Sequence, residues 1–134
     1  RLGMEDRISR YFEPEEMIPS AGQGILAVQG RAGEDYGFLE GYRDQEASLA
    51  AVCERAFVAE LNGGCSSPVA AHARVCGDKI ELMGLYYHEH DKGWLKGRAQ
   101  DRVENAEELG HRLARDLREK YASMVIHGRT QGGK

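Results

Sequence analysis

The chain has 134 residues and a mass of 14.9 kDa, close to the commonest size of a single domain, which excludes several large domains with separate cores. Apolar residues form 41% of the sequence and charged residues 30%, so the chain can bury one modest core beneath a solvated surface, and this composition argues against disorder. The net charge of -4 has the wrong sign for a protein that binds nucleic acid through its overall field.

The first part of the chain predicts a short helix, a turn and a strand. Residues 2–12 carry four apolar side chains at helical spacing, and Pro14 closes this helix. The four side chains are Met4, Ile8, Tyr11 and Phe12. After a turn rich in glycine and small residues at 18–24, the apolar run at 25–29 is typical of a strand buried on both faces. Residues 30–42 predict an irregular connection.

An amphipathic helix follows from Asp44. Its apolar stripe repeats every three or four residues and is formed by Leu49, Val52, Cys53, Ala56, Phe57 and Leu61. Gly63 and Gly64 are expected to end the helix. The stripe places the thiol of Cys53 in the core, where it behaves as a small apolar group.

The pattern then predicts a three-stranded meander. Two strands, 69–75 and 79–87, are joined by a tight hairpin at 76–78, in which Gly77 supplies a positive φ. A third strand is expected at 93–99. Alternate residues of the middle strand share one face: Ile80, Leu82, Gly84 and Tyr86.

A final helix is expected to cover this sheet. Asn105 is its predicted N-cap, with Glu108 three residues further on. Its buried stripe consists of Leu109, Leu113, Leu117 and Tyr121. On the outer face, Glu108 is expected to pair with Arg112. The predicted fold class is therefore α+β, a three-stranded antiparallel sheet covered by helices, with a boundary between two parts of the chain near residues 42–44.

The three cysteines form an odd set. The spacings of Cys53, Cys65 and Cys76 match no zinc pattern and no disulfide framework, so at least one thiol is free. Cys65 follows two glycines and precedes Pro68, which displays its thiol on a constrained loop. Spacing alone leaves two interpretations open: an ordinary loop cysteine beside a helix end, and a functional thiol.

Four segments of the chain resemble segments of one known family, and they occur in the same order and at the same spacing as in that family. Residues 61–72, Leu-Asn-Gly-Gly-Cys-Ser-Ser-Pro-Val-Ala-Ala-His, closely resemble the cofactor-attachment loop of the hydroxymethylbilane synthases, also called porphobilinogen deaminases. Residues 18–28 look like the stretch of that family that contains Gly-Gln-Gly. Residues 54–57 resemble the helix before its cysteine loop, and residues 1–8 resemble its segment that begins Arg-Leu-Gly.

The resemblance implies a cofactor and two site residues. Cys65 is expected to carry a dipyrromethane, two linked porphobilinogen-derived rings bound through a thioether, and to act as an anchor. In that family four further porphobilinogens lose ammonia and are joined head to tail onto this primer, and water then releases hydroxymethylbilane for porphyrin and heme biosynthesis. Gln23 is expected to line the cleft and hydrogen-bond the cofactor or substrate, the alternative being a turn amide that satisfies the local backbone.

The resemblance also implies that other parts of the site lie elsewhere. The family's catalytic aspartate, and the arginines and lysine that pair with substrate carboxylates, precede the region that this chain resembles. No catalytic residue is therefore expected in this chain, which should be the C-terminal part of a transferase and inactive alone. Residues 1–43 would form the end of its second domain and the return strand of its first, as stubs of two α/β domains, and residues 44–134 the C-terminal cofactor-attachment domain.

The expected partners are porphobilinogen, the growing polypyrrole and the missing N-terminal domains, in an enzyme that is monomeric at full length. No apolar run approaches the roughly 18 residues that a membrane-spanning helix needs, and the start has no secretory pattern. We therefore expect a cytoplasmic protein without a membrane or nucleic-acid partner.

Two alternatives come from other classes of protein. A free-standing α+β binding or scaffold module would keep the loop without the activity. A cysteine hydrolase that uses Cys65 with His72 is disfavoured, because no oriented acid partner is apparent. His88, Glu89 and His90 could bind a metal adventitiously, but a solvated polar turn is the better interpretation, so no metal site is expected.

Overall fold

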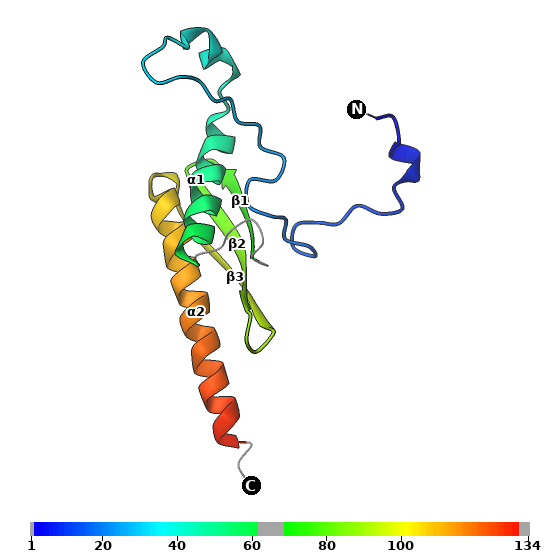
Figure 1. The fold of residues 1–134 in the computed structure, drawn as a ribbon, viewed down its shortest axis with the longest axis vertical. Helices are drawn as coiled ribbons and strands as arrows, with labels where there is room; N and C mark the ends of the chain where they lie inside the picture. Colours follow the sequence, from blue (N-terminus) through cyan, green and yellow to red (C-terminus); the bar gives the residue numbers. More distant parts are fainter. Residues whose placement is uncertain (1, 62–68, 132–134) are drawn as a thin grey trace.

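The computed structural model describes residues 2–61 and 69–131 of the chain. These residues form an α+β fold, which confirms the predicted fold class. The elements are 3-10 helices at Glu5–Arg7, Gly37–Tyr42 and Val103–Asn105, helices α1 (Gln45–Glu60) and α2 (Ala106–Gln131), and strands β1 (Ala70–Cys76), β2 (Lys79–His88) and β3 (Gly93–Arg102). Figure 1 shows α1 and α2 side by side against the sheet, while much of the chain before α1 extends away from them.

The sheet is an antiparallel meander in the order β1-β2-β3, as expected. Ala71 pairs with Gly84, and Gly84 pairs with Gly97, so these small residues form one row across the sheet. The hairpin between β1 and β2 turns at Gly77, whose φ of +65° is in the region that glycine adopts without strain. Alternation along β2 buries Ile80 completely beneath the helices, while the opposite face of the strand carries both polar and apolar side chains, including Glu81 and the buried Met83.

Helix α1 begins with a side-chain cap and ends beside the sheet. The carboxylate of Asp44 accepts the N–H of Ala47 at 2.9 Å, as an N-cap residue does. The predicted stripe buries Cys53 and Phe57 completely, but the assignment of Val52 to it is wrong, because Val52 is 46% exposed at the margin of the buried face. The Phe57 ring lies directly over Gly84, where a Cβ atom would overlap it. Glycine at that position therefore allows the aromatic ring to approach the strand closely.

Helix α2 lies across the sheet and against α1. Leu109, Leu113 and Leu117 of its predicted stripe are buried, which confirms the core face there, while Tyr121, the fourth predicted member, is only partly buried. Gly110 faces α1 so closely that a Cβ atom there would overlap the carbonyl oxygen of Cys53. In the described part of the chain, neither helix has the length and apolar character that crossing a membrane requires.

Two expectations for the N-terminal stretch are wrong. Within residues 2–12 the helix is limited to the 3-10 turn Glu5–Arg7, and residues 25–29 form no strand. Leu26 is 96% exposed and Val28 is 77% exposed. A short helix without a packing surface is unstable, and a strand needs neighbours to pair its backbone, and the described residues supply neither here.

The predicted pair of Glu108 with Arg112 is also wrong. Glu108 instead accepts a hydrogen bond from Arg115 at 2.7 Å, nearly two turns further along α2. Arg112 reaches the sheet, where its guanidinium lies 2.8 Å from Oδ2 of Asp101 on β3. Arg112 thus pairs with a residue of the sheet instead of the residue four positions earlier on its own helix. Helical spacing alone predicts only partners on the same helix.

Asp101 connects β3 to the start of α2. Asn105 directly precedes α2, and its side-chain amide donates to Oδ1 of Asp101 at 2.9 Å. This bond, the backbone N–H of Arg102 and the guanidinium of Arg112 together lower the pKa of Asp101 to about 2. The carboxylate therefore stays ionised through the whole physiological range.

Candidate functional site

The turn that carries Gln23 is closed by backbone hydrogen bonds. The N–H of Gln23 donates to the carbonyl of Ser20, and that of Ile25 to the carbonyl of Gly22, each at 3.1 Å. Gly22 and Gly24 have φ angles of +75° and +81°, which glycine adopts without a steric cost. Gln23 itself is exposed to solvent.

A buried carboxylate fastens this turn to the sheet. Glu54 on α1 is 4% exposed, and its Oε2 accepts the N–H of Gly22 at 2.6 Å. Its Oε1 accepts the N–H of Ala73 on β1 at 2.7 Å. Nearby, the N–H of Ala71 donates to the carbonyl of Pro19 at 3.1 Å. The turn, α1 and β1 are thereby joined at two points, one of them through charge-assisted bonds.

The predicted attachment residue, Cys65, lies outside the described residues. The structure does place the chain on both sides of its segment. Helix α1 ends at Glu60, and the chain is described again from Val69, immediately before β1. Because β1 is the strand that Glu54 holds, the Gln23 turn and the strand after the Cys65 segment are brought together.

The end of α1 is held by basic side chains of α2. Oε2 of Glu60 lies 3.0 Å from Nδ1 of His111 and 3.6 Å from the guanidinium of Arg115. Arg118 donates to Oε1 and to the carbonyl of Glu60, both at 3.2 Å. Desolvation opposes ionisation of Glu60, but His111 and the two arginines outweigh it and lower the pKa of this carboxyl. The point where the chain leaves α1 is therefore fixed against α2.

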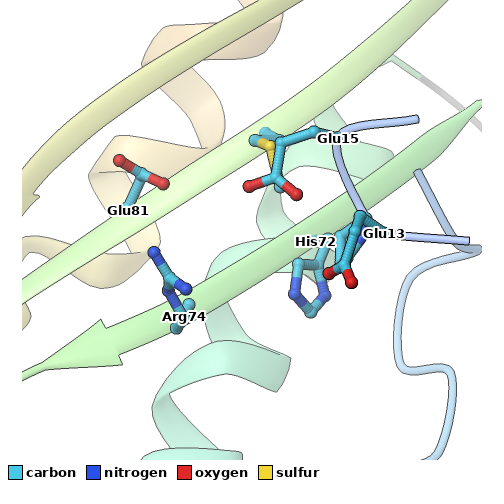
Figure 2. A pocket seen from close by; sticks show the side chains of 7 residues that line it. Glu13, Glu15, His72, Arg74 and Glu81 are labelled. Carbon is cyan, nitrogen blue, oxygen red and sulfur yellow. The ribbon is translucent and has the colours of Figure 1, made fainter. Parts of the chain in front are cut away.

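The face of the sheet opposite the helices carries a polar cavity of about 250 Å³ (Figure 2). Five of the side chains in its wall are polar: Glu13, Glu15, His72, Arg74 and Glu81. His72 stands between this cavity and the core, with its Nδ1 3.9 Å from Oε1 of Glu54. Glu15 is also engaged by Arg98 on β3, at 3.2 Å. Three of these side chains are carboxylates and one is a guanidinium, so the wall of the cavity is predominantly acidic.

The two described cysteines differ sharply in environment. Cys53 is completely buried, and desolvation together with the nearby charge of Glu54 raises the pKa of its thiol to about 12. Cys76 is free and exposed at the hairpin end of β1. The prediction of a core thiol at Cys53 is confirmed, and this residue is unsuited to covalent chemistry.

We expect a thiol reagent to distinguish these two cysteines. In a chain that carries Cys65→Ser, Cys76 should be labelled at neutral pH while Cys53 stays unlabelled, since the reactive form is the thiolate. Intact mass should show one label in the native chain and two in denaturant. Labelling of Cys53 at the rate of Cys76 under native conditions would contradict its placement.

The histidines near the second hairpin form a separate cluster. Nδ1 of His88 lies 3.1 Å from Oδ2 of Asp91, and its ring stacks on Tyr121 with the centroids 5.2 Å apart. His90 lies nearby, with its ring 6.0 Å from that of His88. Over residues 2–61 and 69–131, no group of three or more potential ligand side chains is arranged to hold a metal ion.

Sequence patterns alone did not identify Glu54 as a site residue. A signal was present, because Glu54 lies on the same face of α1 as Ala50 and Phe57, and a charge on a buried stripe requires partners. Its partners, however, are the backbone N–H groups of Gly22 and Ala73, 32 and 19 residues away along the chain. The spacing of side chains along the sequence therefore cannot predict that these backbone groups would bind Glu54.

Two family models match the chain. Residues 48–119 match the model described as porphobilinogen deaminase, C-terminal domain. Residues 1–37 match porphobilinogen deaminase, dipyromethane cofactor binding domain. Together the two models cover the Gln23 turn, most of α1 and all three strands.

Individual relatives agree with these models. The chain is 45% identical over 117 residues to the porphobilinogen deaminase of Ruminiclostridium cellulolyticum, covering 87% of this chain and 40% of the relative. It is 43% identical over 133 residues to the porphobilinogen deaminase of Alkaliphilus oremlandii, and the match covers 96% of this chain and 42% of the relative. It is 35% identical over 130 residues to the porphobilinogen deaminase of Roseiflexus castenholzii, and the match covers 96% of this chain and 43% of the relative. The chain therefore spans about 40% of the length of the curated relatives it matches.

Proposed function

The chain belongs to the porphobilinogen deaminase family, and on this basis we propose that it is the primer-carrying C-terminal part of a hydroxymethylbilane synthase. The whole enzyme would join four porphobilinogen molecules head to tail, with loss of one ammonia at each addition, and release hydroxymethylbilane. Its partners would be porphobilinogen, the growing polypyrrole and the remaining domains of the enzyme. We place it in the cytoplasm as a monomer at full length.

One observation carries this proposal. The Gly22-Gln23-Gly24 turn and the strand that follows the Cys65 segment are far apart in the sequence, yet Glu54 and the bond from Ala71 to Pro19 fasten them together. A primer anchored at Cys65 would therefore extend from a segment whose exit is fixed beside an exposed amide. A free-standing scaffold would have no need of this arrangement.

We assign the dipyrromethane to Cys65. The environment of the other thiols supports this assignment, because Cys53 is buried with a raised pKa and Cys76 lies at the opposite end of β1 from the Gln23 turn. A cysteine sulfur bonded to a pyrrole methylene is a thioether, which water does not cleave as it would a thioester. When bound, the dipyrromethane supplies the pyrrole carbon to which the next unit is joined.

The residues of this chain would bind and orient, and we assign none of them a catalytic role. The amide of Gln23 can both donate and accept, so it can bind a pyrrole N–H or a side-chain carboxylate. The glycines beside it allow a ligand to approach the backbone closely. We divide the chain into residues 1–43, which belong with the rest of the enzyme, and residues 44–134, the attachment domain.

The test is a chimera in which this chain replaces the matching 40% of the Ruminiclostridium cellulolyticum relative. We expect its intact mass to exceed that of the polypeptide by two porphobilinogen molecules less two ammonia molecules, and we expect it to turn over porphobilinogen. Peptide mapping should place the adduct on Cys65. The isolated chain should show no turnover.

Two cysteine variants of the chimera provide the controls. Cys65→Ala should lose both the adduct and the activity, whereas Cys76→Ala should keep both, because Cys76 lies away from the Gln23 turn. A folded chimera with an unmodified Cys65 would contradict the proposal. It would favour a binding or scaffold module that keeps the loop without the chemistry.

A further inference from the structure

Glu54 occupies an unusual place for a charged side chain. It lies on the buried face of α1 with 4% of its surface exposed. Among the described residues, its ion-pair partner is His72, whose Nδ1 is 3.9 Å from Oε1. A buried carboxylate with no guanidinium or ammonium group in contact is costly. The bonds from Gly22 and Ala73, at 2.6 Å and 2.7 Å, are therefore the contacts that keep this charge in the core.

These two bonds decide where the Gln23 turn stands. Burial holds the turn only weakly, because Gln23 and Gly24 are exposed and the side chain that packs against the core is the small, partly buried methyl group of Ala21. The bonds within the turn fix its shape, but they do not fix its position on the sheet. The position of the turn is set by the carboxylate of Glu54. One of its oxygens accepts the N–H of Gly22 in the turn, and the other accepts the N–H of Ala73 on β1. The carbonyl of Pro19 adds a second point of attachment to β1.

We propose that Glu54 is a positioning residue that sets Gln23 against the strand leaving the Cys65 segment. This inference rests on the proposed function, since it gives the Gln23 turn a task in holding primer or substrate. Glu54 acts through the backbone of Gly22 and touches neither ligand. Glutamine has the same shape but cannot replace it, because its Nε2 would face one of the two N–H donors.

The first test uses the unmodified chain of 134 residues and needs no activity. NMR should detect trans-hydrogen-bond couplings from the amide nitrogens of Gly22 and Ala73 to the carboxylate carbon of Glu54. Both amide protons should also exchange slowly with solvent. A folded chain that lacks these couplings, with a rapidly exchanging Gly22 amide, would overturn the inference even if every variant failed to fold.

The second test uses the active chimera and the variant Glu54→Gln. A small displacement of an orienting group costs up to about 100-fold in rate, so we expect kcat to fall by about 10–100-fold. KM should stay within about twofold, and the cofactor adduct should remain. The matched control is Glu46→Gln, an exposed glutamate in the first turn of the same helix, which should leave both constants unchanged.

A double-mutant cycle separates positioning from a merely structural role. If Glu54 acts through Gln23, then Glu54→Gln should add little further loss in a chimera that already carries Gln23→Ala. Independent losses that add fully would overturn the inference, and so would a Glu54→Gln chimera as active as the Glu46→Gln control. Neither result would affect the proposed function. An unmodified wild-type chimera would contradict that function instead, and the NMR couplings would then decide the role of Glu54.

Discussion

Phe57→Ala is expected to lower the free energy of unfolding by about 3–5 kcal/mol, the usual cost of removing a buried aromatic ring. Phe57 is completely buried and joins α1 to the sheet by lying over Gly84. Its removal leaves a cavity that the neighbouring strand cannot fill, because glycine has no side chain. Urea denaturation of the variant should show a lower midpoint with an unchanged m-value.

Gly84→Ala provides the partner for a double-mutant cycle. In the wild-type background the added methyl group overlaps the Phe57 ring and should destabilise the chain by about 1–3 kcal/mol. In the Phe57→Ala background the same methyl group enters the cavity, so its cost should vanish or change sign. Equal costs in the two backgrounds would show that ring and glycine do not pack against each other.

Gly110→Ala should destabilise the chain although it improves the helix propensity of α2. In an exposed helix this substitution stabilises by about 1 kcal/mol. Here the methyl group would overlap the backbone of α1 at Cys53, which cannot move aside as a flexible side chain would. Overpacking of this kind costs about 1–3 kcal/mol or more, so the helices must separate and the net effect should be a loss.

Denaturation can check the sign of this effect. The control is Asp116→Ala, an exposed position on the same helix, where only the gain in propensity should appear. If Gly110→Ala stabilised the chain as much as Asp116→Ala, the close contact between α1 and α2 would be wrong.

The fold of residues 44–131 could be predicted because its signals are local. The stripe that contains Phe57 and the alternation around Leu82 each identify an element and its buried face within a few residues. Prediction failed where an element depends on distant partners. Residues 25–29 have the composition of a buried strand, but nothing in the described residues covers Leu26, so the pattern forms no strand.

The residues of the candidate site also differ in whether the sequence could predict them. Gln23 could be proposed because its segment resembles the Gly-Gln-Gly stretch of the porphobilinogen deaminases, and the structure then places it in an exposed turn. Glu54 could not, since its role depends on backbone donors supplied by other segments. The end of α1 gives a further example, because the basic residues that hold Glu60 stand on α2 and become neighbours only when the two helices pack.

The bonds made by Ala71 and Ala73 also bear on aggregation. Strand β1 is an edge of the sheet, and the N–H groups of these two residues point outward from it, toward Pro19 and Glu54. Unpaired donors on such an edge are a template for strand addition between molecules. With both N–H groups already bonded, a strand from another copy cannot extend the sheet there without first breaking these contacts. The features that orient the turn thus also protect the edge of the sheet from polymerisation.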